Sequence, residues 1–179
     1  FDDIYKYAEL ASLTSISFLS IAINGAELTC FLIFIGAIGK SAQIFFHTWL
    51  PDAMEAPTPA SALLHGSTMT AAGVFLLCRI SPVLELAPNA GMFIAIVGVS
   101  TAFYAASVAL VQNDIKQIIV YSTCSQCGFI FFAVGVGLYQ SAILHLISYV
   151  FFQTVLFLGA GSVICAMRNE RDIRKNGSL

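Results

Sequence analysis

Charged residues are scarce in this sequence: of its 179 residues, 10% are charged and 58% are hydrophobic. A soluble domain of average composition carries about 25% charged residues. So few charges cannot cover a small globule with polar groups, and the mean hydropathy of +0.86 reflects the same excess of apolar side chains. The composition excludes an ordinary soluble domain and predicts a protein whose solvent is mostly lipid.

The sequence also lacks the motifs of cofactor, metal and nucleotide sites. It has no glycine-rich phosphate loop, no dinucleotide fingerprint and no paired-histidine metal motif. Cys124 and Cys127 have a CxxC spacing without a second pair, so we interpret all five cysteines as small buried hydrophobic residues. We expect no cofactor, metal ion or redox centre in this chain, and the net charge of −2 gives no reason to expect nucleic acid.

Long apolar stretches are present instead, each near the roughly 20 residues that a helix needs to span a bilayer. The polar joints between them are short, so no soluble domain interrupts the series. The sequence therefore predicts an all-α, polytopic membrane protein with about five transmembrane helices. The stretches are Leu28–Leu50, Pro59–Ile80, Gly91–Val111, Ile118–Leu138 and Ser141–Met167.

These stretches divide the chain into three predicted regions. Residues 1–27 form a polar and interfacial lead-in, residues 28–167 the transmembrane region, and residues 168–179 a charged tail. The start at Phe1, without a methionine or a signal peptide, leads us to expect a piece of a longer protein. Basic residues are more frequent on the side of the tail, which predicts that the tail faces the mitochondrial matrix or the cytoplasm.

The first apolar stretch contains polar residues where a lipid-facing helix would have none. Two glycines, Gly36 and Gly39, precede Lys40, and further polar residues follow it. In many transporters, interrupted helices place charges and backbone dipoles near the middle of the membrane. We predict non-helical backbone at residues 36–40 or just after them, followed by an irregular joint with three prolines between residues 51 and 59.

Lys40 is the leading candidate for proton transfer. A charge at bilayer depth costs several kcal/mol, and such residues usually mark a path for ions or protons. Burial favours the neutral amine while a nearby carboxylate favours the ammonium, so a lysine between these influences can take up and release a proton. The alternative is a lysine that snorkels to the membrane surface. Lys40 lies about 12 residues into its stretch, too deep for easy snorkelling.

His65 and Lys116 are two further candidates. A neutral imidazole has one donor and one acceptor, so His65 can pass a proton between waters, with Ser61 and Thr68 as supporting polar neighbours. The alternative is a histidine ring satisfied by a backbone carbonyl. Lys116 lies beside Asp114 at the start of an unusually polar helix, which can hold water. Its alternative is an anchor at the membrane surface.

His145 begins a polar stripe in the last apolar stretch. Tyr149 and Gln153 follow at intervals of four residues, which puts the three side chains on one helix face. Such a stripe must face protein or water. Tyrosine and glutamine can orient water, but neither titrates readily near neutral pH. The alternative is an interhelical hydrogen-bond seam with no part in proton transfer.

The polar parts of the chain contain long, specific motifs. They are Gly39–Gln43, His47–Pro59, Ser61–His65, Gln112–Lys116, Tyr121–Gln126, Phe151–Phe152, Leu156–Leu158, Gly161–Ile164 and Asp172–Lys175. Together they resemble the antiporter-like subunits of respiratory complex I, and the later motifs resemble the subunit-five branch in particular. The resemblance covers most of the chain from about residue 36, and the motifs are too long for chance.

The resemblance implies a longer helical fold with two inverted repeats, each containing a broken helix. It places Lys40 at the pumping lysine of a broken helix and His65, Lys116 and His145 on a central hydrophilic axis. The family's acidic partner of the lysine lies on an earlier helix that is not among these residues. Other chains, or other parts of a longer chain, would supply it.

The sequence departs from the family pattern at three positions. Phe45 stands where the family usually has proline, so we expect the break in the helix to depend more on glycines. Tyr149 and Gln153 stand where the family usually has histidine and lysine, so two titratable groups are replaced. Either water and Tyr149 bridge this part of the relay, or this half of the relay is weakened.

The resemblance implies a proton-translocating membrane subunit of NADH:ubiquinone oxidoreductase, driven by redox chemistry elsewhere in that complex. Its partners would be lipid and other membrane subunits of the complex. Its location would be the mitochondrial inner membrane, with a bacterial plasma membrane as the less favoured alternative. Two other functions stay open: a cation/proton antiporter subunit, and a structural membrane spacer whose channel is weakened or inactive.

Overall fold

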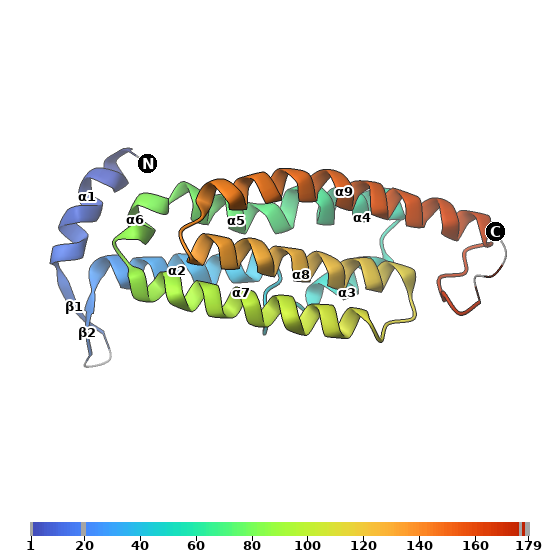
Figure 1. Ribbon diagram of the computed structural model, residues 1–179, viewed down its shortest axis with the longest axis horizontal. Helices are drawn as coiled ribbons and strands as arrows, with labels where there is room; N and C mark the ends of the chain where they lie inside the picture. The colour runs from blue at the N-terminus through green and yellow to red at the C-terminus, as the bar shows by residue number, and fades with distance from the viewer. Residues whose placement is uncertain (1, 19–20, 176, 178–179) are drawn as a thin grey trace.

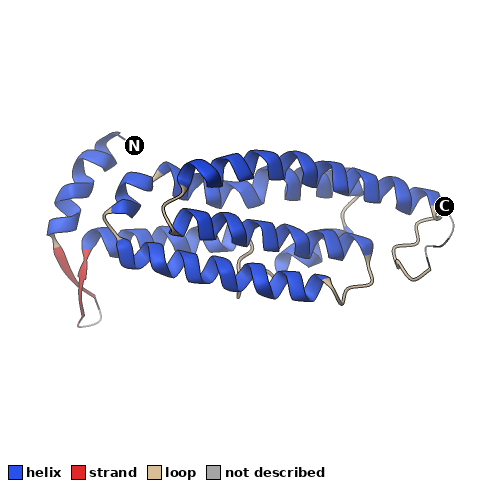
Figure 2. Cartoon of the chain, viewed as in Figure 1, coloured by secondary structure: helices blue, strands red, loops and turns tan. Residues whose placement is uncertain are grey.

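The computed structural model describes residues 2–18, 21–175 and 177, and it confirms the prediction of an all-α membrane fold. Most helices run along one long axis (Figure 1). The helix α1 (Asp2–Leu13) lies at one end of this bundle and the C-terminal tail at the other. Among the described residues, strands are confined to one short hairpin beside α1 (Figure 2).

Among the residues that the structure describes, three helices are long and apolar enough to cross a membrane: α7 (Pro88–Ala109), α8 (Ile115–Gly135) and α9 (Tyr139–Ala166). They contain 22, 21 and 28 residues. At about 1.5 Å per residue, each is at least as long as the roughly 30 Å hydrocarbon core. Each coincides with one of the last three predicted stretches to within a few residues.

The second predicted stretch is one helix that changes type near its middle. α4 (Thr58–Leu63) continues through a π-helical turn, η2 (Leu64–Thr68), into α5 (Met69–Arg79). The backbone N–H of Met69 bonds to the carbonyl of Leu64, five residues earlier. Single π turns inside helices are uncommon and frequently lie at functional sites, and this one contains the candidate histidine.

The first predicted stretch breaks after Lys40, as predicted. α2 (Gly25–Lys40) ends there and residues 41–48 are not helical. A short helix α3 (Trp49–Asp52) and a 3-10 turn η1 (Ala53–Glu55) then lead to the next helix. The break therefore puts Lys40 at a helix C-terminus, where the backbone dipole favours positive charge.

The residues with unusual backbone angles at the break are not the ones that the sequence predicted. Gly36 and Gly39 are ordinary helical residues, whereas Ala42 and Phe45 have φ angles of 48° and 74°. The expectation that glycines carry the break is therefore wrong. Positive φ is uncommon for residues with a Cβ atom. Proline, whose ring fixes φ at about −65°, cannot adopt the conformation of Phe45.

The lead-in ends in a hairpin that the sequence did not predict. The strands β1 (Ser15–Phe18) and β2 (Ile21–Asn24) pair in antiparallel register before α2 begins. The hydroxyl of Tyr5 on α1 donates to the carbonyl of Arg79, just before a short helix α6 (Ser81–Glu85). The division of the chain into lead-in, transmembrane region and tail stays a prediction.

The helices α7 and α8 pack with their backbones in contact. A Cβ atom on Gly98 would lie 2.6 Å from the nitrogen of Phe132, and one on Gly128 would lie 2.6 Å from the oxygen of Gly98. Gly135 approaches Ala95 in the same way, with 2.5 Å between such a Cβ and the Ala95 nitrogen. Real Cβ atoms do not come this close. Small residues at helix contacts are typical of membrane proteins, where they let backbones approach.

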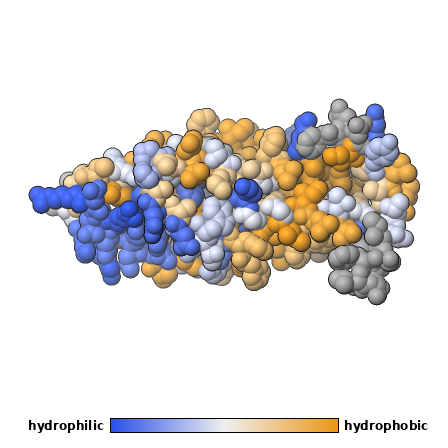
Figure 3. Space-filling view, turned by 180° about the vertical axis from the view of Figure 1, so that it is seen from behind, coloured by the Kyte–Doolittle hydropathy of each residue, from blue (hydrophilic) through white to orange (hydrophobic). Residues whose placement is uncertain are grey.

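Large hydrophobic side chains cover much of the outside of the bundle. On the face shown in Figure 3, hydrophobic residues extend along most of the length and hydrophilic residues gather toward the end with the tail. Phe103, Leu110 and Phe151 are 78%, 88% and 71% exposed. Soluble monomers rarely show contiguous apolar surface of this extent, so lipid or further helices must cover it.

Candidate functional site

Lys40 lies on an open face of α2. The residue is exposed, and Cβ atoms added to Gly36 and Gly39 on the neighbouring turn would meet nothing within 4 Å. Within the part of the chain that the structure describes, no carboxylate forms an ion pair with Lys40. This face has room for a closely packed helix. A carboxylate partner from outside these residues stays a prediction.

Hydrogen bonds made by Ser41 and Trp49 help to hold the break in place beside Lys40. The hydroxyl of Ser41 donates to the carbonyl of Thr70 on α5, at 2.8 Å. The indole N–H of Trp49 donates to the carbonyl of Gly39, at 3.0 Å. The last carbonyls of a helix have no partner within it, so Trp49 satisfies one of them. Sequence reasoning missed Trp49, because its contact depends on the course of the non-helical residues.

His65 is fully buried in η2, and neither ring nitrogen has a hydrogen-bond partner among the described residues. The ring stacks on Phe157 of α9, with centroids 5.7 Å apart and planes 30° from parallel. Ser61 and Thr68, predicted to support it, donate their hydroxyls to carbonyls of their own helix. The ring is therefore not satisfied by a backbone carbonyl here, and its donor and acceptor are both available to water.

Lys116 is only 3% exposed at the start of α8. Its ammonium donates to the carbonyl of Ala56, in the turn before α4, at 3.0 Å. Asp114 caps α8, because its carboxylate accepts the backbone N–H of Lys116 at 2.8 Å. Beside the ammonium lies a pocket of about 380 Å³, which Glu55 and Arg171 also line. Such burial does not fit the interpretation of Lys116 as a surface anchor.

The polar stripe of α9 faces the interior of the bundle, as predicted. Tyr149 and Gln153 have no exposed surface, while His145 is half-buried. The amide of Gln153 donates to the hydroxyl of Thr123 on α8. His145 Nε2 lies 3.0 Å from Gln126 Oε1, and because an amide oxygen only accepts, the imidazole is the donor. These contacts fit an interhelical hydrogen-bond seam.

The four candidate proton carriers are not bonded directly to one another. Among the described residues, no hydrogen bond joins any two of them, so proton transfer between them needs intervening groups. Buried polar atoms almost always have a partner, and ordered water is a common one. Within the described part of the chain, the buried side-chain atoms without a protein partner are Gln43 Oε1, His47 Nδ1, both ring nitrogens of His65 and Gln153 Oε1. Sequence reasoning did not nominate Gln43 or His47.

The structure tests the predicted burial of the cysteines. All five are free, four are buried as predicted, and Cys165 is exposed. The prediction for Cys165 is wrong, because the last turn of α9 is not covered on that side. Over the described ranges, no group of three or more His, Cys, Asp and Glu side chains comes together as a metal site would need.

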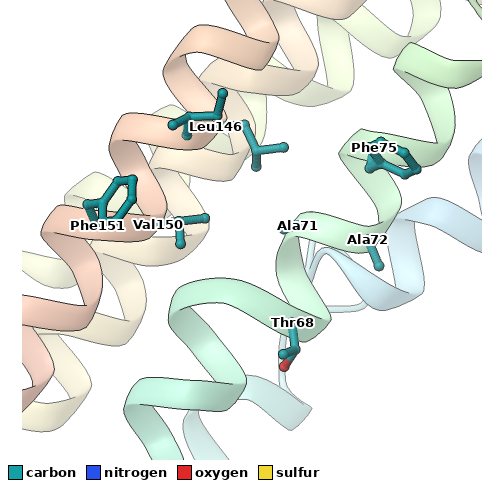
Figure 4. Close-up of a pocket in the computed structure, with 8 residues that line it drawn as sticks. Thr68, Ala71, Ala72, Phe75, Leu146, Val150 and Phe151 are labelled. Atoms are coloured by element: carbon teal, nitrogen blue, oxygen red, sulfur yellow. The ribbon is translucent and has the colours of Figure 1, made fainter.

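An apolar groove of about 410 Å³ lies between α5 and α9 (Figure 4). Among its lining residues, only Thr68 carries a polar side-chain atom. The groove therefore suits acyl chains or the side chains of another helix and offers no group for proton transfer. Its lining residues are Thr68, Ala71, Ala72, Phe75, Leu146, Ile147, Val150 and Phe151.

Relatives with two different names align with most of this sequence. It is 57% identical over 178 residues to the "NADH-quinone oxidoreductase subunit L" of Rhodobacter capsulatus. It is 52% identical over 162 residues to the "NADH-ubiquinone oxidoreductase chain 5" of Arabidopsis thaliana. These matches cover 99% and 90% of this chain but 25% and 24% of the relatives. The chain therefore spans about a quarter of their length.

A solved structure and a family profile agree with these relatives. The structure of the Mrp complex from Dietzia sp. DQ12-45-1b matches with a TM-score of 0.76 at 40% identity, over 79% of this chain and 16% of that chain. The profile of the family described as "NADH:quinone oxidoreductase/Mrp antiporter, TM" matches residues 3–179. The chain is thus a multi-pass membrane protein that belongs to the NADH:quinone oxidoreductase/Mrp antiporter family.

Proposed function

We propose that this chain is the central part of a proton-translocating membrane subunit of NADH:ubiquinone oxidoreductase. The observation that carries the proposal is His65, a buried imidazole with neither ring nitrogen bonded to protein. An unsatisfied buried polar group costs about 1–3 kcal/mol. We interpret this cost as the sign of a function, in which the imidazole exchanges protons with water. The names of the relatives support this particular complex.

In the proposed mechanism, Lys40 holds a proton while a carboxylate is near and releases it when the carboxylate withdraws. His65 accepts a proton at one ring nitrogen and donates from the other. Lys116 uses one of its three N–H donors on the Ala56 carbonyl, and its remaining donors are available to water in the adjoining pocket. His145 would complete the axis beside Gln126. Redox chemistry elsewhere in the complex would supply the energy.

Two other functions are supported by specific observations. A cation/proton antiporter subunit is favoured by the structural match to an Mrp complex, although the relatives from Rhodobacter capsulatus and Arabidopsis thaliana have oxidoreductase names. A structural spacer with a weakened or inactive channel is favoured by Tyr149 and Gln153. The hydroxyl of Tyr149 and the side-chain N–H group of Gln153 donate hydrogen bonds to their neighbours, as in a passive seam.

The proposed partners are other membrane subunits of the complex, together with lipid around the apolar surface and no nucleic acid. One of those subunits, or another part of a longer chain, would supply the carboxylate facing Lys40. We propose the mitochondrial inner membrane as the location, although relatives come from a bacterium as well as from eukaryotes. Co-migration of the protein with the complex in purified mitochondrial inner membranes tests this, and its absence from that fraction would refute it.

The function is tested by Lys40→Met in the intact complex, reconstituted in vesicles and driven by NADH. We expect proton translocation per NADH to fall sharply while the complex still assembles, because methionine keeps the bulk but not the charge. Lys40→Arg should fail as well, because arginine does not deprotonate at accessible pH. Lys6→Met, on the exposed lead-in helix, is the matched control and should pump normally.

Each alternative predicts a different result. A spacer predicts that Lys40→Met pumps at the wild-type rate, which would also overturn the proposal. An antiporter predicts cation-dependent proton movement that needs neither NADH nor quinone.

A further inference from the structure

Tyr149 lies in the polar stripe of α9, and its hydroxyl is held by a hydrogen bond to the backbone of another helix. Its ring is fully buried on α9, and its hydroxyl donates to the main-chain carbonyl of His65 at 3.1 Å. The same carbonyl accepts the hydroxyl of Thr70 at 3.0 Å. A carbonyl oxygen has two lone pairs, so two side chains from different helices fill one backbone acceptor.

This acceptor is available because of the π turn. In an α-helix, the carbonyl of His65 would accept the backbone N–H of Met69, four residues later. Here that N–H bonds to Leu64 instead, and the carbonyl of His65 loses its usual donor. The hydroxyls of Tyr149 and Thr70 take its place. The π turn and the two hydroxyls are therefore parts of one local structure.

The same hydrogen bonds continue to the broken helix. The carbonyl of Thr70 accepts the hydroxyl of Ser41, the residue that follows Lys40. An unbroken series of contacts thus runs from Ser41 through Thr70 and the carbonyl of His65 to Tyr149. It joins the end of α2, the π turn and α9, and these three elements surround the proposed path near His65.

We propose that Tyr149 is a positioning residue for His65 and does not itself carry a proton. Its hydroxyl fixes the π turn, which holds the imidazole of His65 against Phe157 with both ring nitrogens free to meet water. The phenol proton points at a main-chain carbonyl, which cannot pass a proton onward. The effect on pumping rests on the proposed function, whereas the effect on the π turn does not.

The test compares Tyr149→Phe with Thr70→Val in the intact complex. Each change removes one hydroxyl from the carbonyl of His65 and keeps the size of the side chain. Two measurements are made: the pH profile of NADH-driven pumping, and amide hydrogen exchange of the peptide that covers residues 64–70. Ser148→Ala is the matched control, because the Ser148 hydroxyl donates only to carbonyls of its own helix.

We expect both variants to accelerate amide exchange in residues 64–70 by about fivefold, because the loss of one ordinary hydrogen bond makes local opening that much more frequent. Both should lower pumping several-fold and move its pH profile in the same direction, while Ser148→Ala changes neither. Thr70 does not titrate, so its agreement with Tyr149→Phe distinguishes positioning from proton transfer.

Two outcomes overturn the inference. In the first, Tyr149→Phe blocks pumping although its amides exchange at the wild-type rate, and Thr70→Val pumps normally. Tyr149 would then be a proton carrier. In the second, the amides of residues 64–70 exchange at the same rate in Tyr149→Phe as in the wild type. The proposed function fails separately, when Lys40→Met pumps normally, and the exchange measurement still decides the role of Tyr149 in that case.

Discussion

The contact between α7 and α8 makes Gly128→Ala a damaging substitution, although alanine is the smallest possible change. A Cβ atom there would lie 2.6 Å from the carbonyl oxygen of Gly98 and 2.7 Å from the nitrogen of Ala102. Both atoms belong to the backbone of α7, so no change of rotamer relieves the contact. Ordinary separations are about 3.5–4.0 Å, and the helices would have to move apart by about 1 Å.

The free energy of this change can be worked out from its parts. Overpacking of a tight contact costs about 1–3 kcal/mol. The hydrogen bond from the hydroxyl of Ser125 to the carbonyl of Ala102, now 3.0 Å, would stretch beyond its useful range, at about 1 kcal/mol. Alanine returns about 1 kcal/mol through its higher helix propensity. The net loss of stability is therefore about 1–3 kcal/mol.

The assay is the midpoint of thermal inactivation of the purified complex, together with the amount of complex that assembles. Gly159→Ala is the matched control, because a Cβ atom on that glycine of α9 would meet nothing within 4 Å. We expect Gly128→Ala to lower both readings, whereas Gly159→Ala should leave them unchanged or raise them slightly through its higher helix propensity. If the two variants are equally abundant and equally heat-stable, the backbone contact between α7 and α8 does not stabilise the protein.

Two further predictions concern the break and the tail. Phe45→Pro should reduce assembly on native gels, because proline cannot reach a φ of 74°. Phe45→Gly should assemble normally, and equal assembly of both variants would refute this account. In the tail, the hydrogen-bonded Arg174 lowers the pKa of Asp172 to about 2. The pairing is therefore complete above the ordinary pKa of about 3.9 and is lost only as the pH falls through about 2. Exchange of the tail amides, corrected for intrinsic rates, should be equal at pH 6 and pH 8, and a difference would contradict the pairing.

Much of the fold could be predicted because it depends on local composition. Apolar stretches near 20 residues long give helices in lipid whatever lies beside them. The break after Lys40 was also predictable, since polar residues inside such a stretch conflict with a straight lipid-facing helix. The inward orientation of Tyr149 and Gln153 followed from their spacing of four residues, because one helix face cannot be polar and still face lipid.

The features that could not be predicted depend on contacts between distant residues. The hydroxyl of Tyr149 bonds to the carbonyl of His65, 84 positions earlier in the sequence. No local sequence pattern predicts that partner or the π turn. The same holds for Gly98 and Gly128, since glycines occur elsewhere in the chain without close neighbours. The positive φ angles at the break were hidden because the residues there, Ala42 and Phe45, rarely adopt them.

The glycine contacts between α7 and α8 also limit where this protein can change shape. Between most helices, side chains form a deformable layer that adjusts when one helix slides or rolls. At Gly98 and Gly128 that layer is missing and backbone meets backbone, so we expect the two helices to resist sliding or rolling against each other. If the proposed function holds, we expect changes of shape to occur in segments outside regular α-helix. Two such segments adjoin the candidate residues: residues 41–48, directly after Lys40, and η2, which contains His65.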